Sequence, residues 1–271
     1  MIRSLLIAAL LVFGMSACGE KSAPPPPPPP AKAPEVTPAP PSPPAAPATK
    51  VTPVPPPPPA APATKVTPVP PPPPATPPQA GLHYQLISPP QPTDSGKKVE
   101  VLEFFWYGCP HCAHLQPTLR TWLKKKPADV DFRRAPAVLG DSWIPLTWAY
   151  HTLDVMGLVE KLHDEVFAAI HEQRIRLSDQ NVLFDWVAKQ GVDRKQFIDT
   201  YNSFGVKSRG MRSIEMSRDY DISSTPTLVV DGRYMLAPSM FLKPDKNIDY
   251  ERFSNVLDQV IAIARKQRAG K

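Results

Sequence analysis

Residues 99–112 read VEVLEFFWYGCPHC, and this stretch decides the fold. Its first part is apolar and aromatic, which is typical of a buried β-strand, and Gly108 ends the run. Pro110 suits the first turn of a helix, where a missing amide costs nothing. An amphipathic helix is expected from Cys112 to about Lys125. The stretch therefore predicts a strand that runs into a helix, with two cysteines at the junction.

The rest of the chain predicts an α/β fold with a helical insertion. Residues 129–134 alternate like a second strand, and the pattern is then mostly helical from about 141 to 218. Residues 227–236 read as two short strands joined by Asp231-Gly232, a strong hairpin signal. An amphipathic helix over residues 249–267 closes the chain. We therefore expect two halves of one sheet to enclose the insertion.

The spacing of Cys109 and Cys112 suits reversible disulfide chemistry, because two sulfurs within one helical turn can bond. A helix N-terminus supplies amides and a positive dipole end, which favour a thiolate. Cys109 precedes the helix, so we expect its sulfur to be exposed and reactive. Cys112, one turn in, should be more buried and should resolve a mixed disulfide. His111 is expected to tune the Cys109 thiolate through its imidazole.

Other uses of the two cysteines remain open. A zinc site would want two further ligands, and only His111 and His114 lie nearby. A covalent haem site would want histidine directly after Cys112, where Ala113 stands. A static structural disulfide is a further alternative. The expected redox group is the cysteine pair itself, with no metal and no other cofactor.

The N-terminus predicts export. Residues 1–17 combine a basic start, a short apolar run and small residues, which describes a signal peptide. The small residues before Cys18 resemble the lipobox of bacterial lipoproteins, in which this cysteine is acylated. An ordinary cleaved signal with an incidental cysteine is the alternative. Several acyl chains would anchor the protein to a membrane, in an oxidising compartment where disulfides persist.

Residues 18–80 are expected to form a disordered, proline-rich linker. The chain has 40 prolines, and 29 of them fall between Pro24 and Pro78. Residues 45–60 and 60–75 are the same sixteen-letter string, AAPATKVTPVPPPPPA. Proline favours extended polyproline II, so the tract is predicted to act as a tether with a reach of roughly 170 Å. Recognition by a proline-binding module is the alternative.

Charge patterning gives no sign of a nucleic-acid partner. The formal net charge is +6, and the one dense basic run is Lys124, Lys125 and Lys126. This run reads as a solvated helix end, and no aromatic residues are interleaved with basic ones. We expect no nucleic acid among the partners.

Residues 101–105 together with the Cys109–Cys112 motif resemble the DsbA family of disulfide-forming oxidoreductases, over about residues 82–264. The resemblance implies a thioredoxin fold with an inserted helical domain, so residues 81–271 would be one DsbA-like domain. The stretch Ser224-Thr225-Pro226-Thr227 is similar to the family's cis-proline loop. This implies that Pro226 is cis and that Thr225 and Pro226 meet substrate peptide; an ordinary trans turn proline is the alternative.

The resemblance assigns further residues around the motif. Glu103 corresponds to a buried acid beneath the resolving cysteine, which would have a raised pKa and could relay a proton to Cys112. A surface-facing Glu103 is the alternative. Trp106 and Tyr107 are candidates for an apolar surface that docks peptide, although core packing is nearly as good a reading.

The resemblance also implies a function. We expect a monomeric, lipid-anchored periplasmic enzyme that donates its disulfide to reduced exported polypeptides and is reoxidised by a DsbB-like, quinone-linked membrane partner. Two alternatives stay open: a disulfide reductase or isomerase, and a non-catalytic tethered interaction protein with a structural disulfide.

Overall fold

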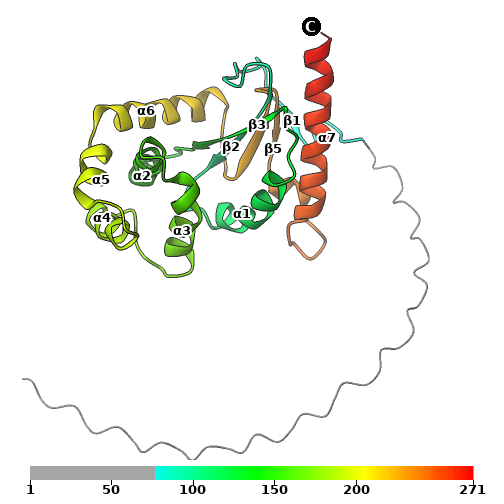
Figure 1. Ribbon diagram of the computed structural model, residues 1–271. Coiled ribbons are helices and arrows are strands. Elements are labelled where there is room, and N and C mark those ends of the chain that lie inside the picture. The colour runs from blue at the N-terminus through cyan, green and yellow to red at the C-terminus, as the bar shows by residue number, and fades with distance from the viewer. Residues whose placement is uncertain (1–76, 271) are drawn as a thin grey trace, which may run out of the picture. The chain divides into compact units, whose positions relative to one another are not determined.

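The structure, a computed structural model, describes residues 77–270 (Figure 1). The predicted signal peptide, Cys18 and most of the proline-rich linker therefore lie outside the described residues. Ordered contacts begin at Gln79, whose carbonyl accepts hydrogen bonds from the amides of Leu82 and His83. Within the described part, no helix is both long and apolar enough to span a bilayer.

The strands of the described residues form one five-stranded sheet. The central strand β2 pairs in parallel with β3 and antiparallel with β4, and the strand order is β1-β5-β4-β2-β3. Every residue of β2 is buried, as its apolar sequence predicts. The strands are β1 (Gln85–Leu86), β2 (Val99–Phe105), β3 (Val130–Pro136), β4 (Thr227–Val230) and β5 (Tyr234–Leu236).

Two helices cover one face of this sheet. Leu115 and Leu119 of α1 (Pro110–Leu123) pack with Val260 of α7 (Tyr250–Ala269) against the apolar side chains of β2, β4 and β5. The predicted helix therefore begins two residues earlier than expected, at Pro110, and it continues through Pro117. Helix α1 is also the crossover that joins the parallel strands β2 and β3, which need such a long connection.

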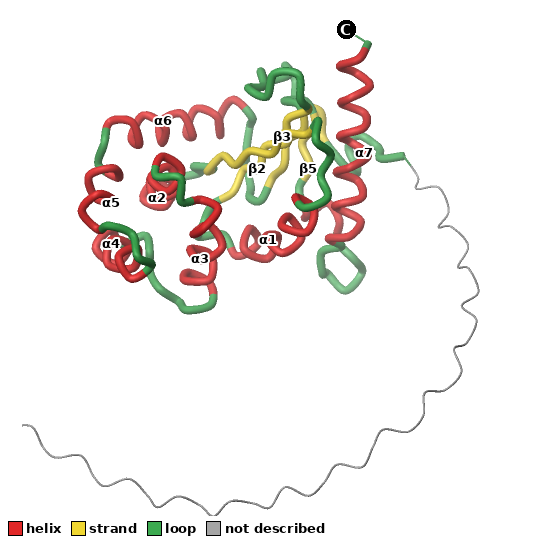
Figure 2. The backbone as a smooth tube through the Cα atoms, viewed as in Figure 1, coloured by secondary structure: helices red, strands yellow, loops and turns green. Residues whose placement is uncertain are grey.

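The predicted helical insertion is confirmed between β3 and β4, where Figures 1 and 2 show its helices gathered at one end of the sheet. Its own core joins Phe105 at the end of β2. The elements are η1 (Asp141–Trp143), α2 (Ile144–Val155), α3 (Val159–His171), α4 (Gln180–Lys189), α5 (Arg194–Tyr201) and α6 (Phe204–Asp219), and the short η2 (Pro238–Phe241) follows β5.

The predicted hairpin is also confirmed. Asp231 and Gly232 both have positive φ, 56° and 63°, as a two-residue turn of this kind requires. A Cβ on Gly232 would lie 2.1 Å from the carbonyl oxygen of Gln91, so glycine is also needed for close approach. The two-residue strand β1, which pairs with β5, is missing from the sequence prediction because its residues show no alternation.

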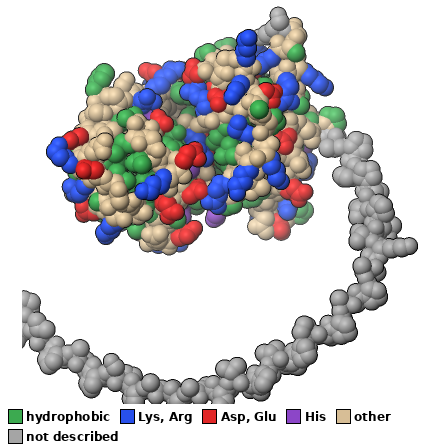
Figure 3. Space-filling model, viewed as in Figure 1, with side chains coloured by type: hydrophobic (Ala, Val, Ile, Leu, Met, Phe, Trp, Pro, Cys, Tyr) green, Lys and Arg blue, Asp and Glu red, His purple; other side chains and the backbone are tan. Residues whose placement is uncertain are grey.

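Charges of both signs are interspersed on the face of the molecule that Figure 3 shows. No single-sign stripe crosses this face, which agrees with the absence of a nucleic-acid pattern in the sequence.

Candidate active site

Cys109 and Cys112 lie at the start of α1, directly after β2. Cys109 is the N-cap residue, and its carbonyl accepts a hydrogen bond from the amide of Ala113. Both cysteines are thiols. Cys109 is 8% exposed and Cys112 is 0% exposed, so their order of burial is as predicted. The expectation that the Cys109 sulfur is freely exposed is wrong, because the loop that carries Thr225 covers it.

The environment of Cys109 favours its thiolate. Its pKa falls from 9.0 to about 5, and the largest cause is a hydrogen bond from the Cys112 thiol. Burial opposes this shift, while the Thr225 side chain and the backbone amides of Cys112 and His111 add to it. The two amides belong to the first turn of α1, where helix donors have no intrahelical partner. The thiolate is therefore stabilised by the helix start, as predicted.

His111 acts on the thiolate through its backbone rather than its side chain. Its amide is one of the donors that lower the Cys109 pKa, whereas the exposed imidazole is not among them. The imidazole lies 6.4 Å from that of His114, measured between ring centroids. The tuning role predicted for the imidazole stays a prediction, whereas the helix N-terminus and Cys112 lower the Cys109 pKa.

Cys112 has the opposite environment. Burial raises its thiol pKa well above the usual range, and the neighbouring Cys109 and Glu103 charges add to the rise. At neutral pH the pair therefore holds one anion, on Cys109, and one proton, on Cys112. This asymmetry matches the roles predicted for an attacked sulfur and a resolving sulfur.

The loop before β4 closes over Cys109. The Thr225–Pro226 peptide bond is cis, as predicted, which excludes the ordinary trans turn. The Cys109 thiol donates to the Thr225 carbonyl at 3.4 Å. This carbonyl can pair only with the protonated sulfur. A side-chain hydrogen bond with Thr225, in contrast, lowers the Cys109 pKa. Thr225 and Pro226 therefore lie beside the Cys109 sulfur, and their contact with substrate peptide stays a prediction.

Glu103 is a buried acid beneath the cysteine pair, so the alternative of a surface position is wrong. Side chains alternate along β2, which places Glu103 on the same sheet face as Val101, under α1. Glu103 is 0% exposed. Burial raises the pKa of its carboxyl group, while Arg134 and Gln116 lower it in part. The raised pKa agrees with the sequence expectation.

Two residues that the sequence analysis did not identify hold this acid. Gln116, one turn after Cys112, donates to Glu103 Oε1 at 3.1 Å and to the Cys112 carbonyl at 3.3 Å. Arg134, directly opposite Glu103 on the neighbouring strand, places Nε 3.3 Å from Glu103 Oε2. Among the described residues neither of these two atoms has a partner with hydrogen-bond geometry, so this contact is an ion pair only.

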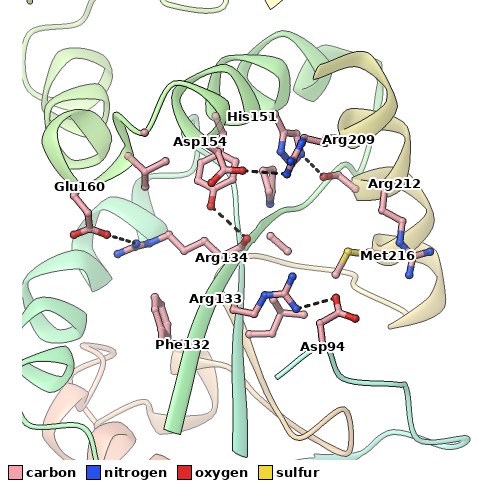
Figure 4. A pocket seen from close by; sticks show the side chains of 17 residues that line it. Asp94, Phe132, Arg133, Arg134, His151, Asp154, Glu160, Arg209, Arg212 and Met216 are labelled. Atoms are coloured by element: carbon pink, nitrogen blue, oxygen red, sulfur yellow. Dashed lines mark hydrogen bonds and ion pairs between the residues drawn. The ribbon is translucent and has the colours of Figure 1, made fainter. Parts of the chain in front are cut away.

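Arg134 also lines a cavity of about 520 Å³ between β3 and the insertion. Figure 4 shows its guanidinium directed toward Glu160, while Arg133 turns toward Asp94. The Arg134–Glu160 distance is 4.0 Å, and Glu160 is 97% exposed. The buried Glu103 is thus electrostatically linked, through one guanidinium, to charge that faces solvent.

The aromatic residues before the motif have different roles. Trp106 is half-buried and stacks on Trp143 with ring centroids 4.2 Å apart. A Cβ on Gly108 would lie 2.4 Å from the Trp106 ring, so the turn into Cys109 requires glycine. Trp106 remains a candidate for the docking surface. Trp143 thus supports Trp106 beside the active site.

Tyr107 does not belong to a docking surface. It is 1% exposed, and its hydroxyl is 3.0 Å from His163 Nδ1 in the core of the insertion. The prediction of a surface role is wrong because the ring packs between Tyr150 of α2 and Phe167 of α3. The reading as core packing is correct.

The Cys109 thiolate gives a direct pH prediction. Absorbance of the reduced protein near 240 nm, where thiolates absorb, should rise in one step centred at about pH 5. The rise should be absent in Cys109→Ser and nearly unchanged in Ala113→Ser, which alters a neighbour that carries no thiol. A step near pH 8.5, the value of an ordinary cysteine, contradicts the described environment.

Comparison with known proteins is consistent with this geometry. Residues 100–243 match the family described as "DSBA-like thioredoxin domain". The chain is 39% identical over 163 residues to a thiol:disulfide interchange protein DsbA of Burkholderia cepacia, covering 60% of this chain and 77% of that protein. It is 37% identical over 183 residues to the DsbA of Pseudomonas syringae pv. tomato, covering 68% and 83%.

Solved structures give the same result. The crystal structure of Pseudomonas aeruginosa DsbA superposes with a TM-score of 0.65 at 35% identity and covers 71% of this chain and 97% of that one. DsbA from Xylella fastidiosa gives a TM-score of 0.63 at 32% identity, covering 70% and 98%. The similarity thus extends over nearly the whole of each solved chain.

Proposed function

This chain belongs to the DsbA family of thioredoxin-fold protein disulfide oxidoreductases, and from that premise we propose that it donates the Cys109–Cys112 disulfide to exported polypeptides. The observation that carries the proposed direction is the low pKa of Cys109, about 5, beside a Cys112 whose pKa is raised. A protein that stabilises its reduced form in this way gives its disulfide away readily.

The proposed reaction has two exchange steps. A client thiolate attacks Cys109 Sγ, the Cys109–Cys112 bond breaks, and Cys112 departs and takes up a proton because its pKa is high. A second client thiolate then attacks the client sulfur of the mixed disulfide. The Cys109 thiolate leaves, and two electrons have passed from the client to the enzyme. We assign to Glu103, whose charge contributes to the raised Cys112 pKa, the supply of this proton.

The size of the driving force follows from the pKa of Cys109. An unperturbed thiol is almost uncharged at pH 7, so only the two units between a pKa of about 5 and pH 7 count. They stabilise the reduced enzyme by about 2.7 kcal/mol. This raises the reduction potential by roughly 60 mV relative to an unperturbed pair. This stabilisation of the reduced enzyme is lost as pH falls through 5, because the Cys109 thiolate is then protonated.

The cellular setting belongs to the same proposal. The signal-like residues 1–17 support export to the periplasm, and Cys18 supports a lipid anchor there. Return to the disulfide form is assigned to a quinone-linked membrane partner of the DsbB kind. The enzyme works as a monomer with the cysteine pair as its redox group and without a further cofactor.

The proposed direction is tested with a reduced two-cysteine peptide. When the peptide is mixed in equal amounts with the oxidised full chain, it should become oxidised while Cys109 and Cys112 become thiols. Alkylation of free thiols followed by mass spectrometry counts the thiols in each partner. A reductase leaves most of the peptide reduced and instead, in its dithiol form, reduces the peptide disulfide. That outcome rejects the proposal.

A further inference from the structure

The cavity of about 520 Å³ that Arg134 lines lies between β3, α2 and α6 (Figure 4). Its lining combines apolar residues with charged ones. The apolar residues are Leu102, Phe132, Ala135, Pro136, Val159 and Met216. A cavity of this size lies within the range of small-molecule sites, in which an apolar lining is combined with a few polar groups that orient the ligand.

Four arginines line the cavity, and three of them already donate to carboxylates of the chain. The pairs are Arg133 with Asp94 and Glu100, Arg209 with Asp154, and Arg212 with Glu215. Asp219 lies a further 3.8 Å from Arg212. These three arginines and the two lining carboxylates among their partners therefore neutralise one another, and they offer no free positive charge to a ligand.

Arg134 is the exception among the four. Its side chain is only 12% exposed, and within residues 77–270 its guanidinium makes two ion pairs that lack hydrogen-bond geometry. One joins Nε to Glu103 Oε2 at 3.3 Å, and the other joins Nη1 to Glu160 Oε1 at 4.0 Å. Donors that are mostly withdrawn from water are costly when no acceptor meets them. Arg134 therefore presents to the cavity a largely buried fork of N–H groups without a well-placed acceptor.

The place that an acceptor needs is held only loosely. Glu160, the third carboxylate of the lining, is 97% exposed, so it leaves Arg134 at little cost. The Arg134 guanidinium carbon lies 5.0 Å from the centroid of the Phe132 ring. A carboxylate that binds this guanidinium therefore brings the rest of its molecule against the apolar part of the lining.

His151 adds an uncharged polar group to the lining. It is 9% exposed, and its Nε2 lies 2.8 Å from the hydroxyl of Ser213, which also lines the cavity. Its Nδ1 is buried and has no partner among the described residues. Burial and the charge of Arg209 lower the pKa of His151 to about 4, so the ring is neutral at pH 7. Free positive charge in the lining is thus left to Arg134, which favours a ligand with a single negative charge.

We propose that this cavity binds a small organic monocarboxylate, whose carboxylate replaces Glu160 at Arg134 and whose apolar body lies against Phe132 and Met216. An arginine fork pairs with a carboxylate through two parallel hydrogen bonds. A phosphate group fits the fork as well, but its second charge faces no free cation here. Because Arg134 also contacts Glu103, the ligand acts on the acid that is assigned to the Cys112 proton. That consequence rests on the proposed function, whereas the binding itself does not.

The test is an NMR titration of the reduced full chain with 3-phenylpropionate, a monocarboxylate with one aromatic ring. The Arg134 Nε–H signal and the backbone amide signal of Gly157, which lines the cavity, should shift to saturation with a Kd of roughly 1 mM, as expected for a ligand of this size. The amide signal of Gly191, which is not part of the lining, should stay in place. The uncharged 3-phenylpropan-1-ol should bind at least about tenfold more weakly, because it cannot form hydrogen bonds to a charged partner as a carboxylate does.

Two variants test the assigned groups. Arg134→Lys keeps a positive charge beside Glu103 but loses the planar fork, so the Kd should rise about tenfold. Arg194→Lys makes the same exchange at an exposed pair with Asp185 and should bind as the native chain does. Glu160→Gln removes the group that the ligand replaces, so binding should tighten, by up to about fivefold for an exposed ion pair.

The outcomes are decisive for the cavity and separate from the redox proposal. Absence of saturable shifts at Gly157 up to about 20 mM, roughly twenty times the expected Kd, overturns the proposal. Equal binding of the alcohol or of inorganic phosphate also overturns it, since a single carboxylate is then not what the cavity selects. Native affinity in Arg134→Lys, or no gain in Glu160→Gln, overturns the role of Arg134 and with it the proposal. Disulfide donation is measured separately, by oxidation of a reduced peptide, and none of these results changes it.

Discussion

Cys109→Ser should abolish peptide oxidation and leave only the rate that is measured without enzyme. Serine cannot form the disulfide that is donated. The groups that hold the anion, namely the Cys112 thiol and the amides of His111 and Cys112, have no thiolate to stabilise. The measurement is the rate at which a reduced two-cysteine peptide is oxidised, followed by mass spectrometry.

Cys112→Ser is the informative partner of that variant. It keeps the Cys109 thiolate but lacks the sulfur that completes the disulfide, so it should accumulate a mixed disulfide with glutathione or with a client. This adduct should be one per molecule and should be located at Cys109 by peptide mapping. An adduct at Cys112 in the Cys109→Ser variant, formed at a comparable rate, would reverse the assigned roles.

Arg134→Met should lower the free energy of unfolding by about 3 kcal/mol at pH 8. Arg134 is the only basic group within 4 Å of Glu103 among the residues that the structure describes. Removing one partner of a buried pair typically costs about 3–5 kcal/mol, because the remaining charge is stranded. Gln116 still donates to Glu103, which places the expectation at the low end of that range.

The pH dependence of this loss has a definite sign. Glu103 already has a raised pKa, and loss of Arg134 raises it further, because Arg134 is the main group that lowers it. An acid with a raised pKa in the folded state is stabilising while protonated and loses that contribution as pH rises. The Arg134→Met deficit, measured by urea unfolding, should therefore be smaller at pH 5 than at pH 8.

Arg194→Met is the matched control. Arg194 and Asp185 form an exposed pair, with side chains 47% and 62% exposed. Its loss should change stability by less than about 1 kcal/mol at either pH. Equal deficits in the two variants, or an Arg134→Met deficit that grows toward acid pH, contradict the account of Glu103.

The sequence predicts those parts of the site that depend on local order. The strand that leads to Gly108, the helix expected from Cys112 and the CxxC spacing together place two sulfurs near a helix start. The hairpin is equally local, because Asp231-Gly232 specifies its turn. Burial of Glu103 is implied by the resemblance to the DsbA family, and the structure confirms it.

The missed residues depend on contacts between distant parts of the chain. Arg134 lies opposite Glu103 because β2 and β3 pair in one register, and the alternation in residues 129–134 does not reveal that register. Trp143 stacks on Trp106 across the boundary of the insertion. The low exposure of Cys109 likewise depends on Thr225, more than a hundred residues away. The sequence leaves Tyr107 open between a docking surface and the core, because its neighbours in sequence do not show which side α2 and α3 cover.

The equilibrium between the Cys109–Cys112 pair and a glutathione buffer at pH 7 tests the central claim most directly. Because the Cys109 thiolate stabilises the reduced form, the pair should be more oxidising than about −200 mV, the upper end of the glutaredoxin range. A value near −270 mV, as in thioredoxin, would show that loss of the disulfide is not downhill and would contradict the account.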